Sequence, residues 1–393
     1  MNVSSVKTKH YENKSRCRRR ENKPKQTRSE AEIPTGELLG ILKPGTKQTQ
    51  RTLCESFLFF TFVCPGYNLE MQTWTIQTLL NWVIEYLRNK SIDSPRLSAE
   101  LLLSHVLGMK RIELYTQFDK PVAKQQLDQM HDLVKRAGQH EPIAYLTGKT
   151  EFYSLELKVT PDCMIPRPET ELLAERAIEF LRTRPVRNST MYKMIQKEEI
   201  SNGASSGPPT QRLVRRAGIQ FVCDLCTGCG CIAVAIAKNF PNARIIATDI
   251  SDAALRVAAA NVEKYQLKDR IELLQGDLFD PIMPQLDVHK FDLIVCNPPY
   301  VSSEEFEKLD KSVKDYEPEL ALLAGSDGLD IYRQIAEKVH QFLKPDAALM
   351  LEIGFAQGSV VKELLEKTGA FAEIKIEKDF NKNDRIVIAR KTS

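Results

Sequence analysis

The stretch "FVCDLCTGCGCIAVAIAKNF", residues 221–240, decides the fold. It begins with a short apolar run typical of a buried strand, passes through the turn "CTGCG", and continues as an apolar helix. A turn of this kind, at the carboxyl end of the first strand of an α/β sheet, is where nucleotide-type ligands bind. Gly228 and Gly230 allow the backbone to come close to such a ligand, and the amide groups of the helix point toward it.

The sequence after this turn alternates between short apolar runs and helical stretches. Helices are expected around 231–240, 253–266 and 328–343, and the last two β-rich runs are separated by a short turn. This alternation predicts an α/β fold: a doubly wound, Rossmann-like parallel sheet with an antiparallel C-terminal strand pair. The expected strands are "IQFVCDL", "ARIIATDI", "RIELLQGD", "FDLIVCN", "ALMLEIG", "AEIKIEKD" and "DRIVIARK".

The rest of the chain divides by composition. Residues 1–70 begin with ten Lys or Arg against three Glu in the first 30 positions, which predicts a disordered basic extension. Residues 71–145 repeat apolar side chains at helical spacing and predict a small domain of four or five helices. A connecting hairpin and helix follow at 146–182, with Pro168 at the first helical position. Residues 183–218 predict a flexible insertion, and 219–393 form the sheet domain.

Composition excludes several classes of protein. A net charge of +3 over 393 residues is small and does not indicate a polyanionic partner. The longest apolar run near the front, "FLFFTFVC", is far shorter than the roughly 20 residues that span a bilayer. Nine cysteines without the spacing of a secreted disulfide scaffold favour a reducing compartment. We therefore expect a cytoplasmic protein without a membrane segment, and a monomer.

Four of those cysteines fall within nine residues, at 223, 226, 229 and 231, and this spacing raises the possibility of zinc or an iron–sulfur cluster. Such a site requires the thiolates to converge on one ion. Cys223 lies within the expected strand and Cys231 at the start of the helix, so both are expected to pack inward as small hydrophobic residues. Cys226 and Cys229 are expected beside the ligand. We predict no metal, and the fifth candidate, Cys296, is expected in the core.

Two acidic residues follow the next strands. Asp249 ends the second strand, where a carboxylate can accept hydrogen bonds from both hydroxyls of a ribose. Asp277 ends the third strand, within reach of an adenine edge. Together with the glycine turn they predict a site for an adenosine-containing cofactor.

The motif "NPPY", Asn297 to Tyr300, follows the fourth strand. Its prolines fix the backbone, and their carbonyls at Pro298 and Pro299 are left to accept hydrogen bonds from a ligand. With the side-chain carbonyl of Asn297 they can hold a planar NH₂ group, and Tyr300 can stack on its face. An ordinary Asn-Pro turn is the alternative.

A cradle for an NH₂ group beside an adenosine site points to methyl transfer. An amide nitrogen is a poor nucleophile, but acceptors fixed on its N–H groups raise its electron density, and alignment with an electrophile contributes up to about 7–11 kcal/mol. The electrophile would be the sulfonium methyl of S-adenosyl-L-methionine. No nucleophilic side chain is needed.

The sequence resembles the release factor glutamine N5-methyltransferase family between about 72 and 393. The resemblance is carried by "EPIAYLTGKTEFYSLELKVTPDCMIPRPETE" (141–171), "DLCTGCGCIAVAIA" (224–237), "NPPYV" (297–301) and "YEPELALLAGSDGLDIYRQI" (316–335). It implies a class I methyltransferase whose substrate is the glutamine of a Gly-Gly-Gln tripeptide in peptide chain release factors. It also implies that the helical domain docks that protein.

The resemblance further implies which residues bind. The loop Cys226, Thr227, Gly228, Cys229 and Gly230 would contact the cofactor together with Asp249, Leu278 and Asn297, and Asn297 to Tyr300 would hold the glutamine. The sequence departs from the family at Cys226, where a glycine is usual, and at Leu278, where some members have an aromatic ring. Arg167 and Glu169 have two alternative roles that the sequence leaves open: they line the site, or they only start a helix.

Other functions use the same motif. An N6-adenine methyltransferase of nucleic acid grips its base through NPPY, but would need a basic target-recognition region, and only residues 1–30 are basic. A glutamine of a ribosomal protein is a second alternative substrate. A non-enzymatic cofactor-binding or adaptor protein would have no need for Asn297 and Tyr300.

Overall fold

The computed structural model describes residues 73–183, 218–285 and 290–393. The predicted extension 1–70 and nearly all of the predicted insertion 183–218 lie outside the described residues. The first described part is helical, as predicted. Its helices are α2 (Ile76–Asn89), α3 (Pro95–Leu107), α4 (Arg111–Thr116), α5 (Lys124–Ala137) and α6 (Ile143–Thr147).

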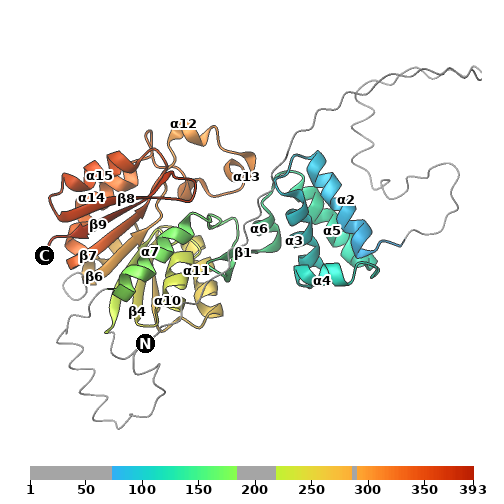
Figure 1. Ribbon diagram of the computed structural model, residues 1–393, viewed down its shortest axis with the longest axis horizontal. Helices are drawn as coiled ribbons and strands as arrows, with labels where there is room; N and C mark the ends of the chain where they lie inside the picture. The colour runs from blue at the N-terminus through green and yellow to red at the C-terminus, as the bar shows by residue number, and fades with distance from the viewer. Residues whose placement is uncertain (1–72, 184–217, 286–289) are drawn as a thin grey trace, which may run out of the picture. The chain divides into compact units, whose positions relative to one another are not determined.

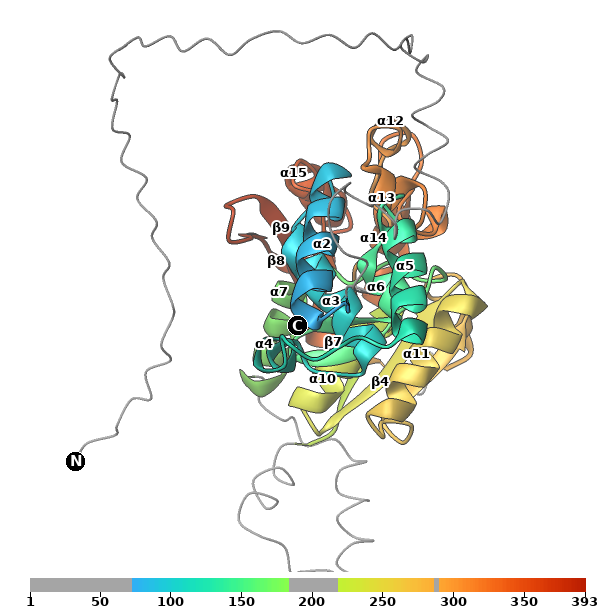
Figure 2. The same ribbon diagram turned by 90° about the vertical axis from the view of Figure 1, so that its right-hand side faces the viewer.

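These helices pack through one apolar stripe each. Helix α2 starts where the hydroxyl of Thr75 accepts a hydrogen bond from the Thr78 amide, and buries Leu79, Val83 and Leu87 on one face. Helix α3 begins at Pro95, a residue type that is favoured at the first helical position. Figure 2 shows α2, α3 and α5 side by side. Their buried apolar residues belong to one hydrophobic cluster.

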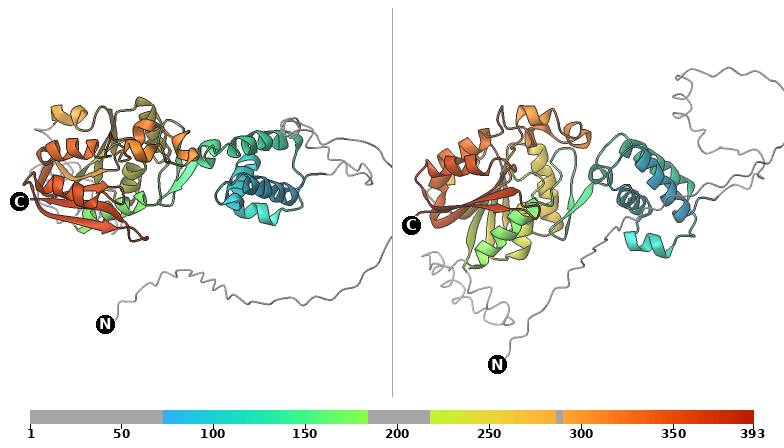
Figure 3. Two further views of the ribbon diagram at one scale, coloured as in Figure 1. Left: turned by 90° about the horizontal axis from the view of Figure 1, so that it is seen from above. Right: turned by 45° about the horizontal axis from the view of Figure 1, so that its top comes forward.

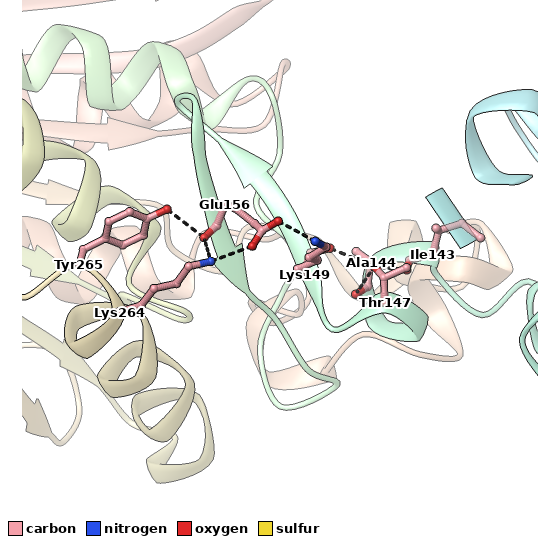
Figure 4. A network of polar contacts seen from close by, with 7 residues as sticks. All are labelled: Ile143, Ala144, Thr147, Lys149, Glu156, Lys264 and Tyr265. Atoms are coloured by element: carbon pink, nitrogen blue, oxygen red, sulfur yellow. Dashed lines mark hydrogen bonds and ion pairs between the residues drawn. The ribbon is translucent and has the colours of Figure 1, made fainter. Parts of the chain in front are cut away.

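A hairpin follows, made of β1 (Lys149–Phe152) and β2 (Leu155–Lys158), which pair antiparallel. Glu156 on β2 accepts from Lys149 across the hairpin at 2.7 Å and from Lys264 at 2.9 Å, while its backbone carbonyl accepts from the Tyr265 hydroxyl at 3.0 Å (Figure 4). Since Lys264 ends helix α11 (Asp252–Lys264), this network attaches the hairpin to the sheet domain.

Helix α7 (Thr170–Thr183) begins two residues later than predicted. Pro168 is not its first residue, because the amides of Thr170 and Glu171 donate to the carbonyls three positions back, at Arg167 and Pro168. These bonds make a tight turn before the helix. The shift places Thr170 at the first helical position, facing the site described below.

The sheet has seven strands in the order β5-β4-β3-β6-β7-β9-β8. The first five are parallel, and β9 pairs antiparallel with both β7 and β8, which confirms the predicted C-terminal pair at one edge. The strands are β3 (Gln220–Leu225), β4 (Ala243–Asp249), β5 (Ile271–Gln275), β6 (Phe291–Cys296), β7 (Leu343–Glu352), β8 (Phe371–Lys378) and β9 (Asp384–Lys391).

Helices cover both faces of the sheet, as the doubly wound pattern predicts (Figure 1). Successive residues of one strand point to opposite faces. Val222 therefore packs with α7, α10 (Cys231–Asn239) and α11, while Cys223 packs with α14 (Asp330–Phe342) and α15 (Gly358–Glu366). Figure 3 shows the sheet and these helices from two other directions.

Short elements connect the strands at the carboxyl end of the sheet. They are η2 (Asp280–Gln285), α12 (Ser303–Phe306), α13 (Lys311–Lys314) and η3 (Glu319–Ala321). Within the described residues, no helix is long and apolar enough to cross a membrane.

Candidate active site

A cavity of about 260 Å³ opens at the carboxyl ends of β3, β4 and β6. This edge of a parallel sheet is where ligands bind in doubly wound folds. Most of the predicted site residues line the cavity. They are Cys226, Thr227, Gly228, Cys229, Asp249, Asp277, Leu278, Asn297 and Pro299. Three predicted residues, Gly230, Pro298 and Tyr300, lie outside its lining.

The loop after β3 bends sharply toward the cavity. Gly228 has φ +56° and Gly230 has φ +81°, values that glycine adopts at little cost. A side chain at Gly230 would also meet the Cβ of Ala258 at 3.2 Å, so this glycine serves the close packing of α10 on α11. Cys226 also has a left-handed backbone with φ +54°, a conformation that favours glycine. The loop therefore turns at Cys226, Gly228 and Gly230.

Asp224, near the end of β3, holds this loop in place through hydrogen bonds. Its Oδ2 accepts hydrogen bonds from the Thr227 hydroxyl at 2.6 Å and from the Ala233 amide at 3.1 Å. Asp224 is fully buried, and burial raises the pKa of its carboxyl to about 7. The carboxylate thus ties the loop to the first turn of α10.

Asp249 faces the cavity from the end of β4. Its Oδ2 accepts from the Gly228 amide at 2.8 Å and its Oδ1 from the Ser251 amide at 2.9 Å. Burial raises its pKa above the ordinary range for aspartate. The two amides hold the carboxylate in place, where its remaining lone pairs can accept hydrogen bonds from two neighbouring hydroxyls.

The loop after β5 forms another side of the cavity. Leu278 is buried with φ +44°, and its carbonyl accepts from the Thr248 hydroxyl at 3.0 Å. Its apolar side chain lies in the lining beside Asp277 and Ile250. This side can receive a flat ring through van der Waals contact.

The NPPY segment lies at the end of β6. The Nδ2 of Asn297 donates to the hydroxyl of Thr170 at 3.2 Å, which leaves the side-chain Oδ1 free to accept from a ligand. Pro298 is buried. Tyr300 packs away from the lining against Gly354, and burial raises the pKa of its hydroxyl to about 12. Its backbone carbonyl accepts from Gln357 at 2.9 Å.

Two loops close the cavity on the side of Asn297. Asp162 to Pro166 come from the segment before α7, and Pro318 to Leu323 come from the segment before α14. Arg167 forms an ion pair with the buried Glu317, which joins the two loops. This contact gives Arg167 a structural role, and Arg167 itself is not in the cavity lining.

Sequence reasoning missed three residues that support the site: Thr170, Asp224 and Glu317. Each is a polar residue that is nearly or fully buried, and two of them bear carboxylates. For Asp224 the available signal was an acidic residue inside an apolar strand, "FVCDL". For Thr170 and Glu317 the sequence held no comparable signal.

The cysteines near the cavity are either buried in the core or part of the cavity lining. Cys223 and Cys296 are buried on strands, as predicted, and Cys226 and Cys229 line the cavity. Cys231 also lines it in part. Among the described residues no three His, Cys, Asp or Glu side chains are grouped so as to hold a metal ion.

Comparison with known proteins places this site in a family. The PrmC N-terminal domain matches residues 78–148, and the methyltransferase small domain matches residues 211–313. The chain is 39% identical to a release factor glutamine methyltransferase of Rhodopirellula baltica over 81% of this chain and 97% of the relative. The chain belongs to the release factor glutamine methyltransferase family.

Further relatives agree. Proteins of the same name from Geobacter sulfurreducens and Chlorobaculum tepidum are 35% and 34% identical, over 98% and 97% of their lengths. The coverage is 81% and 80% of this chain. Membership confirms the predicted family and the Rossmann-like methyltransferase fold. The protein is a methyltransferase enzyme, and the family implies a methyl donor of the S-adenosylmethionine type.

Proposed function

We propose that this protein transfers a methyl group from S-adenosyl-L-methionine to the side-chain nitrogen N5 of the glutamine in the Gly-Gly-Gln motif of peptide chain release factors. One observation carries the proposal. Asn297, whose Nδ2 is engaged by Thr170, lines the same cavity as Asp249 and the glycine loop. An NH₂ group held at Asn297 therefore lies beside a cofactor held at Asp249.

The cavity residues fit the proposed cofactor. The carboxylate of Asp249 suits the ribose hydroxyls, and Leu278 and Ile250 suit the flat adenine ring. When bound, S-adenosyl-L-methionine supplies an electrophilic methyl group on a sulfonium sulfur. The substrate nitrogen would gain this methyl group and release one proton, while the sulfonium becomes a neutral thioether, so the chain needs no nucleophile of its own.

The role we assign to the NPPY segment is to hold and orient the substrate amide. The Oδ1 of Asn297 and the carbonyl of Pro298 accept the two N–H groups, which raises electron density on nitrogen. The surrounding lining is largely apolar, with Pro299 and Leu323 among its residues, and an environment of low polarity strengthens these hydrogen bonds. Orientation and electrostatics together account for the catalysis.

We also propose that helices α2 to α6 dock the release factor. The match to the PrmC N-terminal domain over residues 78–148 supports this role. So does a set of exposed apolar side chains on α3 and α4, with Leu97 40%, Leu101 36% and Ile112 69% exposed. Such a set favours contact with a protein rather than with nucleic acid. The monomeric state and the cytoplasmic location stay predictions.

The test compares protein and nucleic acid as methyl acceptors. The full chain is incubated with labelled S-adenosyl-L-methionine and either a purified release factor or an adenine-containing nucleic acid, with the Asn297→Ala variant as the matched control. We expect label on the release factor only, and none with the variant. Label on nucleic acid and none on the release factor would support the N6-adenine alternative instead.

A further inference from the structure

Two phenylalanine side chains of the sheet domain are exposed to solvent. Phe380 is 97% exposed and Phe355 is 65% exposed. Every other phenylalanine in the described ranges is buried or partly buried. An exposed ring contributes little to the stability of the folded chain, because it stays in contact with water. Where several exposed apolar side chains belong to one rigid part of a surface, they indicate a site of contact with a partner.

Both side chains lie at the edge of the sheet that carries the cavity. Phe355 follows the end of β7, which runs parallel to β6. Phe380 lies in the turn between β8 and β9. Because β9 is antiparallel to both β7 and β8, strand β8 runs in the direction of β7 and ends at the same edge. Asn297, which follows β6, lies at that edge too.

Arg385 joins the two turns that carry these rings. Its Nη1 donates to the carbonyl of Ile353, two residues before Phe355, at 3.2 Å. Its Nη2 forms an ion pair at 3.2 Å with Asp379, directly before Phe380, and the Asp379 side chain is only 5% exposed. The other carboxylate oxygen of Asp379 accepts from two amides within the turn, at 2.9 and 3.0 Å. The backbones that carry the two rings are therefore fixed to each other.

Gln357 fixes the turn of Phe355 to the NPPY segment. Its Oε1 accepts from the Gly354 amide at 2.9 Å, and its Nε2 donates to the Tyr300 carbonyl at 2.9 Å. Gly354 directly precedes Phe355, and Tyr300 directly follows Pro299, which lines the cavity. A continuous set of hydrogen bonds therefore leads from the cavity lining to both rings.

The charges on the turn between β8 and β9 indicate the kind of partner. Residues 378–385 include five charged side chains, and four of them form two ion pairs. The pairs are Lys378 with Asp384 at 2.5 Å and Asp379 with Arg385 at 3.2 Å. A surface that stacks nucleic acid bases on aromatic rings also needs cations for the phosphates. Exposed rings among paired charges fit the apolar side chains of a protein better.

We propose that Phe355 and Phe380 form a contact surface for the release-factor residues that flank the Gly-Gly-Gln motif. The inference rests on the proposed function, because it takes the glutamine held at Asn297 as the fixed point of the bound segment. The glycines of the motif have no side chains, so contacts that distinguish this glutamine from others must come from residues further along the substrate. A segment that leaves Asn297 along this edge reaches the two rings, which bury its apolar side chains.

The first test measures methyl transfer to a full-length release factor at saturating S-adenosyl-L-methionine. We expect Phe355→Ala and Phe380→Ala each to raise KM for the release factor about 10-fold, because each removes an apolar contact with the substrate. The kcat should stay within about twofold of wild type, since this contact is the same in the ground state and the transition state. Thermal unfolding and calorimetric cofactor affinity show whether each variant is folded.

The matched control for these variants is Ile219→Ala. Ile219 is 37% exposed and directly precedes β3, so it lies at the opposite edge of the parallel strands. Its substitution also removes an exposed apolar side chain, and KM should remain that of wild type.

The second test locates the contact. The photoreactive analogue p-benzoyl-phenylalanine replaces Phe380 in the full chain, which is irradiated with a release factor and, in a separate sample, with an adenine-containing RNA. We expect cross-links to release-factor residues next to the Gly-Gly-Gln motif. The same analogue in place of Ile219 should give none there.

Three results would overturn the inference. They are a wild-type KM in both phenylalanine variants, a fall in kcat with unchanged KM, which would mean that the rings only support the site, and cross-links from position 380 that miss the neighbourhood of the motif or form with RNA alone. A wild-type enzyme that leaves the release factor unmodified would instead refute the proposed function. Wild-type turnover is therefore measured first and separates the two failures.

Discussion

Arg167 and Glu317 form an ion pair between two loops that lie 150 residues apart in the sequence. Glu317 also accepts a hydrogen bond from the Ile165 amide at 3.2 Å. Its side chain is 1% exposed, and that of Arg167 is 31% exposed. Both loops contribute to the cavity wall, at Pro166 and at Pro318. The pair therefore fixes the wall beside Asn297.

Replacement of Arg167 by leucine should destabilise the protein in a pH-dependent way. It leaves a buried carboxylate without its cation, and we expect a loss of about 1–3 kcal/mol at pH 8. Burial already raises the pKa of Glu317 and Arg167 lowers it, so the variant has a still higher folded-state pKa. The folded variant then binds a proton that the unfolded chain lacks, and its deficit should shrink as pH falls.

Urea unfolding of wild type and Arg167→Leu between pH 5 and pH 8 measures this effect. The control is Arg88→Leu, which removes an exposed pair with Glu85 and should change stability little. Equal deficits at pH 5 and pH 8 would show that the ion pair is not the cause.

Replacement of Asn297 by alanine should stop turnover while leaving the fold intact. The substitution removes the side-chain acceptor for the substrate amide, and loss of one such preorganised group lowers kcat by about 100- to 1,000-fold. Cofactor affinity should change much less, because Asp249 and the glycine loop are unaltered. Steady-state kinetics and calorimetry measure the two quantities separately. Turnover near the wild-type rate would refute the role assigned to Asn297.

Replacement of Asp249 by asparagine should weaken cofactor binding. The change retains the shape but removes the charge and one acceptor at the end of β4, so we expect Kd for S-adenosyl-L-methionine to rise about 10- to 100-fold. Asp252→Asn, three residues on and exposed in a pair with Arg256, is the matched control. If both variants bound the cofactor equally well, Asp249 would not be the ribose acceptor.

The contribution of Asp224 to the stability of the folded protein should decrease as pH rises toward 7. Burial raises the pKa of its carboxyl from an ordinary value near 4 to about 7, so the folded protein holds a proton that the unfolded chain releases in this range. The stabilising contribution is complete below the unfolded pKa and is lost as pH rises through about 7.

The Asp224→Asn variant tests this dependence. Between pH 5 and 6.5, the substitution should reduce the steepness with which the unfolding free energy changes with pH, by up to about 1.4 kcal/mol per pH unit. The Glu352→Gln variant, whose carboxyl also has a pKa near 7, should give a similar change. A slope identical to wild type in Asp224→Asn would mean that Asp224 is already ionised in that range.

The fold and the part of the cavity lining after β3 and β4 could be predicted because their signals are local in sequence. The turn at Gly228 and Gly230 lies between one strand and one helix, and Asp249 directly ends the next strand. The periodicity of the strands and helices then specifies the sheet. Such patterns need no knowledge of contacts between distant residues.

The supporting residues could not be predicted, because their roles depend on distant contacts. Thr170 meets Asn297 only after α7 packs against the sheet, and Glu317 meets Arg167 across two loops. Strand β7 also starts earlier than its apolar run predicts. It continues through Pro345 and past Asp346, which has φ +58°, at an irregularity in the pairing with β6. A proline and a left-handed residue normally argue against a strand.

The most direct measurement for the whole account is the location of the methyl group on the substrate. A purified release factor is incubated with the full chain and S-adenosyl-L-methionine, digested, and fragmented in a mass spectrometer. We predict one added methyl group on the glutamine of the Gly-Gly-Gln motif, and none when that glutamine is replaced by alanine. A methyl group on any other residue, or an unmodified release factor beside a methylated nucleic acid, would contradict the account.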